Sequence, residues 1–91
     1  MRDAATASIT VVYLARLREA FGTAGERIVP PGDAMTVGSL RETLVSRGGV
    51  WASELGAGRA VRFAVNHALA GPDTPLRDGD EVAVFPPVTG G

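Results

Sequence analysis

The carboxyl end holds the residues that most clearly indicate chemistry. An apolar segment runs directly into Pro86, Pro87, Val88, Thr89, Gly90 and Gly91. Proline restricts the backbone and glycine has no Cβ, so a narrow channel in another protein can close around such a segment. Six extended residues reach about 20 Å at roughly 3.3 Å each. The sequence therefore predicts an extended tail over residues 86–91 that enters a pocket of a partner.

The chemistry of this tail is that of its terminal carboxyl group. A free α-carboxyl has a pKa of about 3.3 to 3.7, so at neutral pH it is an anion that resists nucleophilic attack. Adenylation with ATP in a partner enzyme would supply a leaving group, and sulfur could then replace one oxygen to give a thiocarboxylate. The chain has no cysteine. We therefore expect Gly91 to carry the sulfur, although a Gly-Gly end is weak evidence by itself.

Composition narrows the classes of partner. The 91 residues include 9 basic and 10 acidic side chains, with a formal net charge of -1. This balance gives no cationic footprint for phosphate backbones or anionic lipid, so neither nucleic acid nor a membrane is an expected partner. No apolar run approaches the roughly 20 residues of a membrane span. A cytoplasmic location is expected.

Other polar residues favour structural roles. Asp73, Asp78, Asp80 and Glu81 do not have the spacing of a known calcium loop, and Asp-Gly-Asp before a strand is typical of a turn. His67 is the single histidine and falls in a predicted turn. The glycines match no phosphate-binding loop. We expect no metal site and no cofactor on this chain, with ATP bound by the activating partner.

The chain length supports one small domain. We expect a flexible leader over residues 1–8, a domain over 9–85 and the tail over 86–91. β-Branched and apolar runs predict strands at 9–15, 26–29, 60–65 and 81–85, with the first buried on both faces. Asn66-His67 reads as a tight turn into a short continuation at 68–70. Residues 16–21 favour a short helical turn that Gly22 ends with a positive φ.

One longer helix is expected in the middle of the chain. Thr36 is a suitable N-cap, and Val37, Leu40, Leu44 and Val45 then share one face. Gly48-Gly49 should end this helix, and Trp51 should cover the core in the short segment that follows. These elements predict an α+β fold, a mixed sheet of four to five strands with one main helix packed across it. The apolar first and last strands should be central neighbours.

The segment Asp78-Gly-Asp-Glu-Val-Ala-Val-Phe-Pro-Pro-Val-Thr-Gly-Gly91 closely resembles the end of the small sulfur-carrier subunits of molybdopterin synthase, which are β-grasp proteins of the ubiquitin-like superfamily. Tyr13 to Glu19 and Ala64 to Asn66 resemble the same family in matching order. The resemblance covers Ile9 to Gly91. It departs from the family in the leader and at Thr89, where small residues are usual.

The resemblance implies a function and a set of partners. An E1-like adenylyltransferase would adenylate Gly91, and a sulfurtransferase would supply sulfur for the thiocarboxylate. The large synthase subunit would accept the tail, with Gly90 threading its channel, in a heterotetramer of two small and two large subunits. Sulfur would then enter cyclic pyranopterin monophosphate to form the molybdopterin dithiolene of the molybdenum cofactor. Catalytic side chains belong to the large subunit in that family, so none is expected on this chain.

Ubiquitin-like domains also dock partners through an apolar patch on the sheet near the tail. The candidate interface residues are Phe85, Tyr13, Leu14 and Leu69, although apolar strand residues are more often core. Three other functions remain open: a sulfur carrier for thiazole or amino-acid synthesis, a ubiquitin-like modifier that conjugates Gly91 to lysines, and a plain interaction module. The Pro86-Pro87 pair favours the synthase subunit over the thiazole carrier.

Overall fold

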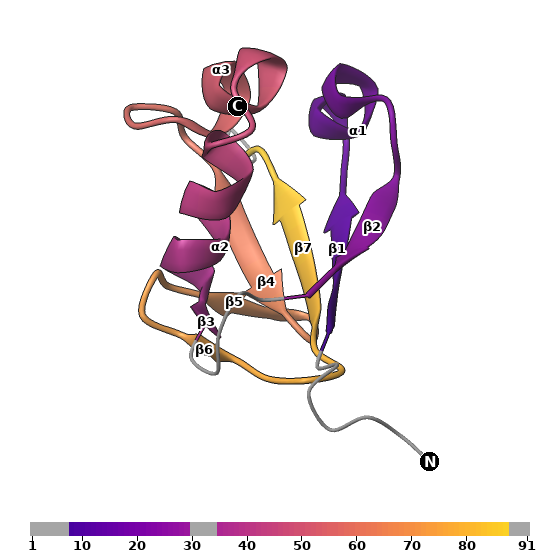
Figure 1. Cartoon of the computed structure of the whole chain (residues 1–91), viewed down its shortest axis with the longest axis vertical. Coiled ribbons are helices and arrows are strands. Elements are labelled where there is room, and N and C mark those ends of the chain that lie inside the picture. The colour runs from indigo at the N-terminus through magenta and orange to yellow at the C-terminus, as the bar shows by residue number, and fades with distance from the viewer. Residues whose placement is uncertain (1–7, 30–34, 88–91) are drawn as a thin grey trace.

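A five-stranded sheet with helices on one face forms the body of the molecule (Figure 1). The computed structural model describes residues 8–29 and 35–87. The strands of this sheet are β1 (Ile9–Tyr13), β2 (Gly25–Ile28), β4 (Arg62–Val65), β5 (Ala68–Ala70) and β7 (Glu81–Phe85). The helices are α1 (Arg16–Phe21), α2 (Val37–Val45) and α3 (Gly49–Leu55). Two short strands, β3 (Met35–Thr36) and β6 (Pro75–Leu76), pair separately beside the sheet.

The sheet has the order β2-β1-β7-β4-β5. β1 and β7 are parallel neighbours in its middle, whereas the β1–β2, β7–β4 and β4–β5 pairs are antiparallel. The expected α+β class and the central pairing of the first and last strands are confirmed. Asn66 and His67 have φ values of 49° and 75°. This backbone matches the two-residue turn predicted between β4 and β5.

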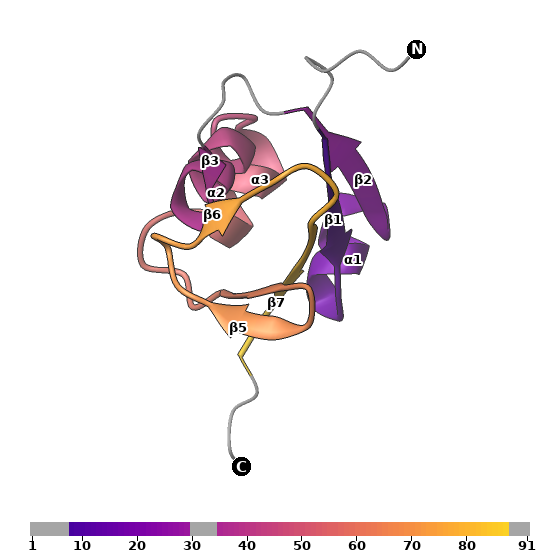
Figure 2. The same cartoon turned by 90° about the horizontal axis from the view of Figure 1, so that it is seen from below.

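Burial of β1 corrects one prediction. Ile9, Val11 and Tyr13 are buried, whereas Thr10 is exposed and Val12 is half-buried. The alternation arises because the helices cover only one face of the sheet, as Figure 2 shows from below. The expectation of burial on both faces was therefore wrong.

α2 begins as the sequence predicts. The Thr36 hydroxyl accepts a hydrogen bond from the Ser39 backbone N–H, and the Ser39 side chain accepts one from the Thr36 N–H. This reciprocal capping box satisfies two donors that a helix start would leave unpaired. Val37, Leu40 and Leu44 are buried toward the sheet.

The segment after α2 is more regular than expected. Gly48, with φ of 76°, ends the first helix region and starts α3, so Gly49 opens a helix as well as following one. Leu55 of α3 is fully buried, and Trp51 packs against the core as predicted. Within the described ranges no helix is long and apolar enough to span a bilayer.

Candidate functional site

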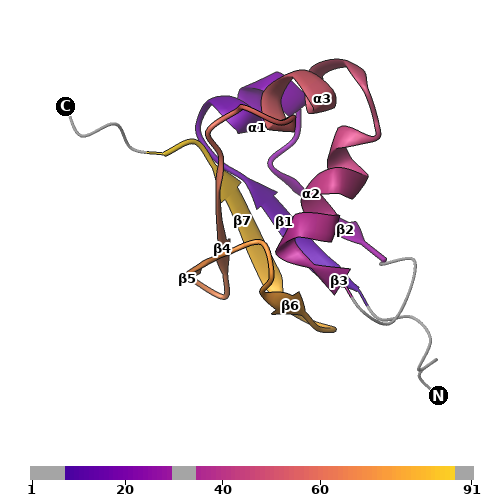
Figure 3. The ribbon, with the colours of Figure 1, turned by 90° about the vertical axis from the view of Figure 1, so that its left-hand side faces the viewer.

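The root of the tail lies at the end of the central strand β7. The Leu14 N–H donates to the Val84 carbonyl at 3.0 Å, which extends the β1–β7 pairing one residue past the end of β1. Pro86 and Pro87 then follow, and having no N–H they cannot continue the ladder. Figure 3 shows the chain leaving the sheet at this end, beside α1 and α3. Val88, Thr89, Gly90 and Gly91 lie outside the described residues.

A hollow of about 410 Å³ adjoins this root. It is lined by Arg16, Gly58, Arg59, Ala60, Pro86 and Pro87. Arg16 and Arg59 both contact the same oxygen, Oε1 of Glu54, at 3.3 and 3.4 Å. The sequence did not single out these three charged residues, because they come from three segments that only the fold brings together.

The helix-free face of the sheet presents an apolar row that crosses four strands. The strand register places Val12 beside Ala83, Ala83 beside Ala64, and Ala64 beside Leu69. We call these four residues the open-face row. Leu69 is 74% exposed, and the other three are half-buried. Because Ala64 and Ala83 in the middle of the row have small side chains, the surface is flat there and suits a flat apolar partner.

Two predicted interface residues flank this row on the tail side. Phe85 is the last residue of β7 and is half-buried, and Leu14 follows β1 with 42% of its surface exposed. The parallel register pairs Tyr13 with Val84, so Leu14 falls beside Phe85. Phe85, Leu14 and Leu69 therefore all lie on the sheet face that the helices leave uncovered. The alternation of β1 and β7 is the signal that would have added Val12 and Ala83 to the prediction.

Tyr13 is a correction to the predicted interface. It is fully buried on the helix-covered face, as Ile9 and Val11 are, because side chains alternate between the two faces along β1. Its ring meets the Phe21 and Trp51 rings edge to face, with centroids 5.0 and 5.4 Å away. Phe21 and Trp51 stack at 3.8 Å. The Tyr13 side chain thus belongs to the core and is not available to a partner.

A polar pair, Glu26 and Arg47, lies beside these three rings. The Tyr13 hydroxyl donates to Glu26 Oε2 at 2.6 Å, and Arg47 donates two bonds to the same carboxylate at 2.8 and 2.9 Å. The Arg47 guanidinium also lies 4.5 Å from the centroid of the Trp51 ring. We call Tyr13, Phe21, Trp51, Glu26 and Arg47 the aromatic corner.

Titration in the aromatic corner follows from these contacts. Burial, reinforced by the neighbouring Glu26 carboxylate, raises the pKa of Tyr13 above its ordinary value. The hydrogen bonds from Arg47 lower the pKa of Glu26, and Glu26 in turn raises the pKa of Arg47. Tyr13 is therefore kept neutral, and Glu26 and Arg47 are kept charged. These three groups have a structural role.

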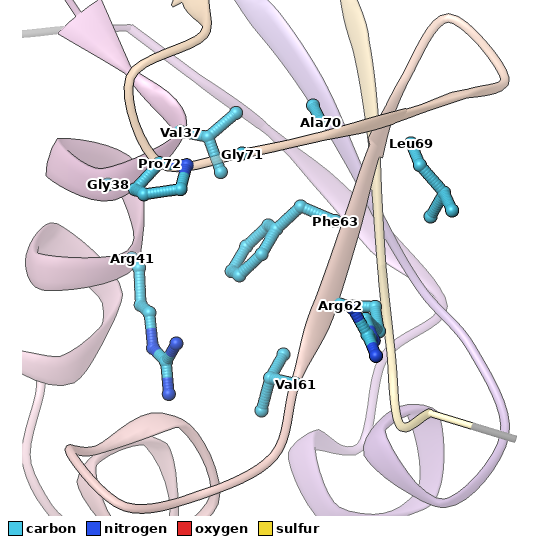
Figure 4. Close-up of a pocket in the computed structure, with 10 residues that line it drawn as sticks. All are labelled: Val37, Gly38, Arg41, Val61, Arg62, Phe63, Leu69, Ala70, Gly71 and Pro72. Carbon is cyan, nitrogen blue, oxygen red and sulfur yellow. The ribbon is translucent and has the colours of Figure 1, made fainter. Parts of the chain in front are cut away.

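A second hollow, of about 450 Å³, lies between α2, β4 and the segment after β5 (Figure 4). Arg41 lines it and donates to the carbonyls of Leu55, Gly56 and Arg59 at 2.7, 3.1 and 3.0 Å. Arg41 therefore fixes the loop between α3 and β4, which lines the hollow beside Pro86 and Pro87.

The acidic residues near β7 hold the turn that precedes this strand. Asp78 Oδ1 accepts from the Ser8 N–H at 2.8 Å, and Asp80 accepts from the Arg77 N–H and from Asn66 Nδ2. In the part of the chain that the structure describes, no group of three or more His, Cys, Asp or Glu side chains is placed to hold a metal ion.

Comparison with known proteins places this geometry in a family. The ThiS family matches residues 11–91. The molybdopterin synthase sulfur carrier subunit of Escherichia coli is 43% identical over 83 residues, which are 91% of this chain and 99% of the relative.

Three solved structures share the fold. A putative molybdopterin converting factor subunit 1 from Pyrococcus furiosus has a TM-score of 0.76 at 37% identity, covering 90% of this chain and 99% of its own. A crystal structure of small archaeal modifier protein 1 of Haloferax volcanii has a TM-score of 0.75 at 25% identity, with coverage of 90% and 99%. A complex of subunits 1 and 2 of molybdopterin-converting factor from Helicobacter pylori has a TM-score of 0.60 at 26% identity, with coverage of 92% and 99%. With a family match over residues 11–91 and a β-grasp sheet, the chain belongs to the ThiS family.

Proposed function

We propose that this chain is the sulfur carrier subunit of a molybdopterin synthase. The observation that carries the proposal is the position of β7, a central strand that ends beside exposed Leu14 and runs into the predicted tail. A partner that docks on the open-face row is therefore placed to receive the tail in the same encounter. The 43% identity to the Escherichia coli carrier subunit, across 99% of that relative, supports the same function.

The chemistry takes place at Gly91. Its carboxylate oxygen attacks the α-phosphorus of ATP in an E1-like adenylyltransferase, which releases pyrophosphate and leaves an acyl adenylate. The terminal sulfur of a sulfurtransferase persulfide then attacks the acyl carbon and AMP leaves, after which a thiol reductant cleaves the acyl disulfide to release the thiocarboxylate. The thiocarboxylate sulfur bonds to a side-chain carbon of cyclic pyranopterin monophosphate in the large subunit, and the oxygen that it replaces leaves as water. Hydrolysis of the resulting thioester leaves the sulfur on the pterin and returns Gly91 to a carboxylate. Each sulfur of the dithiolene consumes one charged carrier.

The residues of this chain bind and position, and the catalytic side chains belong to the partners. Phe85, Leu14 and Leu69 form the contact with the large subunit, and Gly90 leaves room for the walls of its channel. A complex of subunits 1 and 2 exists for the related factor of Helicobacter pylori. We propose the same pairing here, in a cytoplasmic heterotetramer of two small and two large subunits.

The decisive test is sulfur transfer. The chain is prepared with a C-terminal thiocarboxylate, mixed with the large synthase subunit and cyclic pyranopterin monophosphate, and assayed for the dithiolene. We expect product from the intact chain and none after deletion of Gly91, with the same thermal unfolding curve for both. No product, with the thiocarboxylate intact by mass spectrometry and the large subunit active with its own partner, would overturn the assignment.

A second function is favoured by one observation. Small archaeal modifier protein 1 of Haloferax volcanii shares the fold at a TM-score of 0.75. If this chain is a modifier, mass spectrometry of cell extracts will detect Gly91 in isopeptide linkage to lysines of other proteins. A carrier for thiazole synthesis would instead charge with sulfur and fail to transfer it to the pyranopterin.

A further inference from the structure

Two arginines at the root of the tail have no part in the sulfur chemistry. Arg16 is the first residue of α1, and Arg59 belongs to the loop between α3 and β4. Together with Pro86 and Pro87 they line the hollow of about 410 Å³. The fold thus brings two guanidinium groups to the place where the chain leaves the sheet.

Their charge is only partly balanced. Both arginines contact the same Oε1 atom of Glu54, at 3.3 and 3.4 Å. The arginine side chains are 50% and 45% exposed, whereas the Glu54 side chain is 19% exposed. Two cations therefore share one carboxylate and leave a net positive charge that faces solvent. Exposed ion pairs contribute little to stability, so folding alone does not account for the arrangement.

The surrounding backbone holds both arginines in place. Arg41 donates to the Arg59 carbonyl at 3.0 Å and to the carbonyls of Leu55, the last residue of α3, and Gly56. On the other side, Ala15 precedes Arg16 with φ of 55°, a conformation that costs energy for a residue with a Cβ.

The length of the tail determines what comes close to these arginines. Four residues follow Pro87, and at roughly 3.3 Å each they reach about 13 Å. A protein that encloses Gly91 therefore comes within about 13 Å of the residues that line the hollow. We propose that Arg16 and Arg59 form a carboxylate clamp, which receives an Asp or Glu side chain from the rim of the pocket that the tail enters. Guanidinium groups suit this partner because they bind carboxylates through paired N–H donors.

This inference rests on the proposed function and adds to it a feature of the partner. The test is the affinity of the full-length chain for the large subunit of molybdopterin synthase, measured by calorimetry or surface plasmon resonance. The variant is the double substitution Arg16→Gln with Arg59→Gln. Its matched control is Arg27→Gln with Arg77→Gln, which removes two exposed arginines at the opposite end of the sheet. Thermal unfolding curves establish that each variant is folded.

We expect the Arg16 and Arg59 double variant to raise Kd by about tenfold at about 0.1 M salt, mainly through slower association. The control should stay within about twofold of the unmodified chain. The difference should shrink strongly at about 1 M salt, where the Debye length is only about 3 Å. Equal Kd values for variant and control would overturn the clamp and leave the sulfur-carrier function standing. No binding of the unmodified chain to the large subunit would overturn both.

Glu54→Gln separates a clamp from a purely structural ion pair. If Glu54 and the arginines serve only to hold α1, α3 and the loop together, removing either side will weaken binding alike. If a partner carboxylate enters the clamp, Glu54→Gln removes a competitor and the affinity rises while the arginine substitutions lower it. Opposite signs support the clamp, and equal signs contradict it.

The carboxylate could also come from the C-terminus of the chain itself. The arginine side-chain NMR signals of the free full-length chain are therefore compared with those of a chain whose C-terminus is amidated. Unchanged Arg16 and Arg59 signals support a partner carboxylate. A shift of both signals would assign the clamp to the tail and overturn the proposal.

Discussion

Tyr13 and Leu14 are adjacent in the chain but lie in two regions of different character. In one region the apolar surface is buried, and in the other it is exposed. Tyr13 is fully buried in the aromatic corner, where its ring meets two others and its hydroxyl is bonded to Glu26. Leu14 is 42% exposed beside the last strand, on the face that carries the open-face row. In one region apolar area stabilises the fold, and in the other it remains available to a partner.

The difference follows from which face the helices cover. α1, α2 and α3 all lie on the Tyr13 side of the sheet, so every second residue of β1 and β7 is withdrawn from water there. The other face keeps Ala64 and Ala83 in its centre, and their small side chains lose little by remaining accessible. Substitutions in the two regions should therefore separate stability from binding.

The largest effect is expected in the aromatic corner. Trp51→Ala removes the ring that stacks on Phe21 at 3.8 Å and meets Tyr13 edge to face. We expect the free energy of unfolding to fall by about 3 kcal/mol, the lower end for a large aromatic residue, because Trp51 is only partly buried. Urea unfolding followed by circular dichroism measures this change.

The same variant should leave binding intact where it is still folded. At a temperature well below its midpoint, its Kd for the large subunit should match that of the unmodified chain within about twofold, since Trp51 lies on the helix-covered side. A much weaker complex from a fully folded Trp51→Ala chain would show that the two regions are coupled, and the division drawn above would be wrong.

The second prediction concerns acid. Arg47 lowers the pKa of Glu26 in the folded chain, so the ionised carboxylate stabilises the fold above its unfolded pKa, near 4.5, and this contribution is lost as pH falls through the lower folded value. Glu26→Gln should cost about 2 kcal/mol near neutral pH, because the charge-assisted bonds from Arg47 and Tyr13 are weakened.

The sign of the pH dependence provides the check. The gap in unfolding free energy between the unmodified chain and Glu26→Gln should narrow as pH falls below about 4, since both then carry a neutral side chain at this position. Glu19→Gln, on α1, provides the matched loss of one carboxylate elsewhere. A gap that stays constant with pH would mean that Glu26 stabilises the corner by packing and not by charge.

Features that depend on neighbouring residues in the sequence were predicted, whereas features that depend on long-range contacts were not. Thr36 as an N-cap and Asn66-His67 as a tight turn depend on a few neighbouring residues, and both are confirmed. The two-sided burial of residues 9–15 was wrong, because an apolar run does not reveal that helices cover a single face.

The candidate site likewise contains residues that the sequence predicted and a group of residues that only the fold brings together. Gly90 and Gly91 were predicted from the chemistry of a chain end and remain predictions, since they lie outside the described residues. Leu14 and Leu69 are exposed and their contact with a partner stays a prediction, whereas buried Tyr13 is not available for such a contact. The grouping of Arg16, Glu54 and Arg59 depends on three segments meeting at the end of the sheet, and no spacing in the sequence encodes it.

The smallest effect is expected on the open face. Leu69 is 74% exposed at the end of the open-face row, so Leu69→Asp should change the free energy of unfolding by no more than about 0.5 kcal/mol. A carboxylate there would lose its water against an apolar partner surface, and we expect Kd for the large subunit to rise about tenfold, or about 1.4 kcal/mol. Val29→Asp is the matched control, because Val29 is also an exposed aliphatic residue, at 56%, but lies past β2 at the far edge of the sheet. If both aspartates weaken the complex equally, then added negative charge is the cause and the row is not the contact. If only Leu69→Asp does so, the partner contacts the apolar surface that the helices leave uncovered.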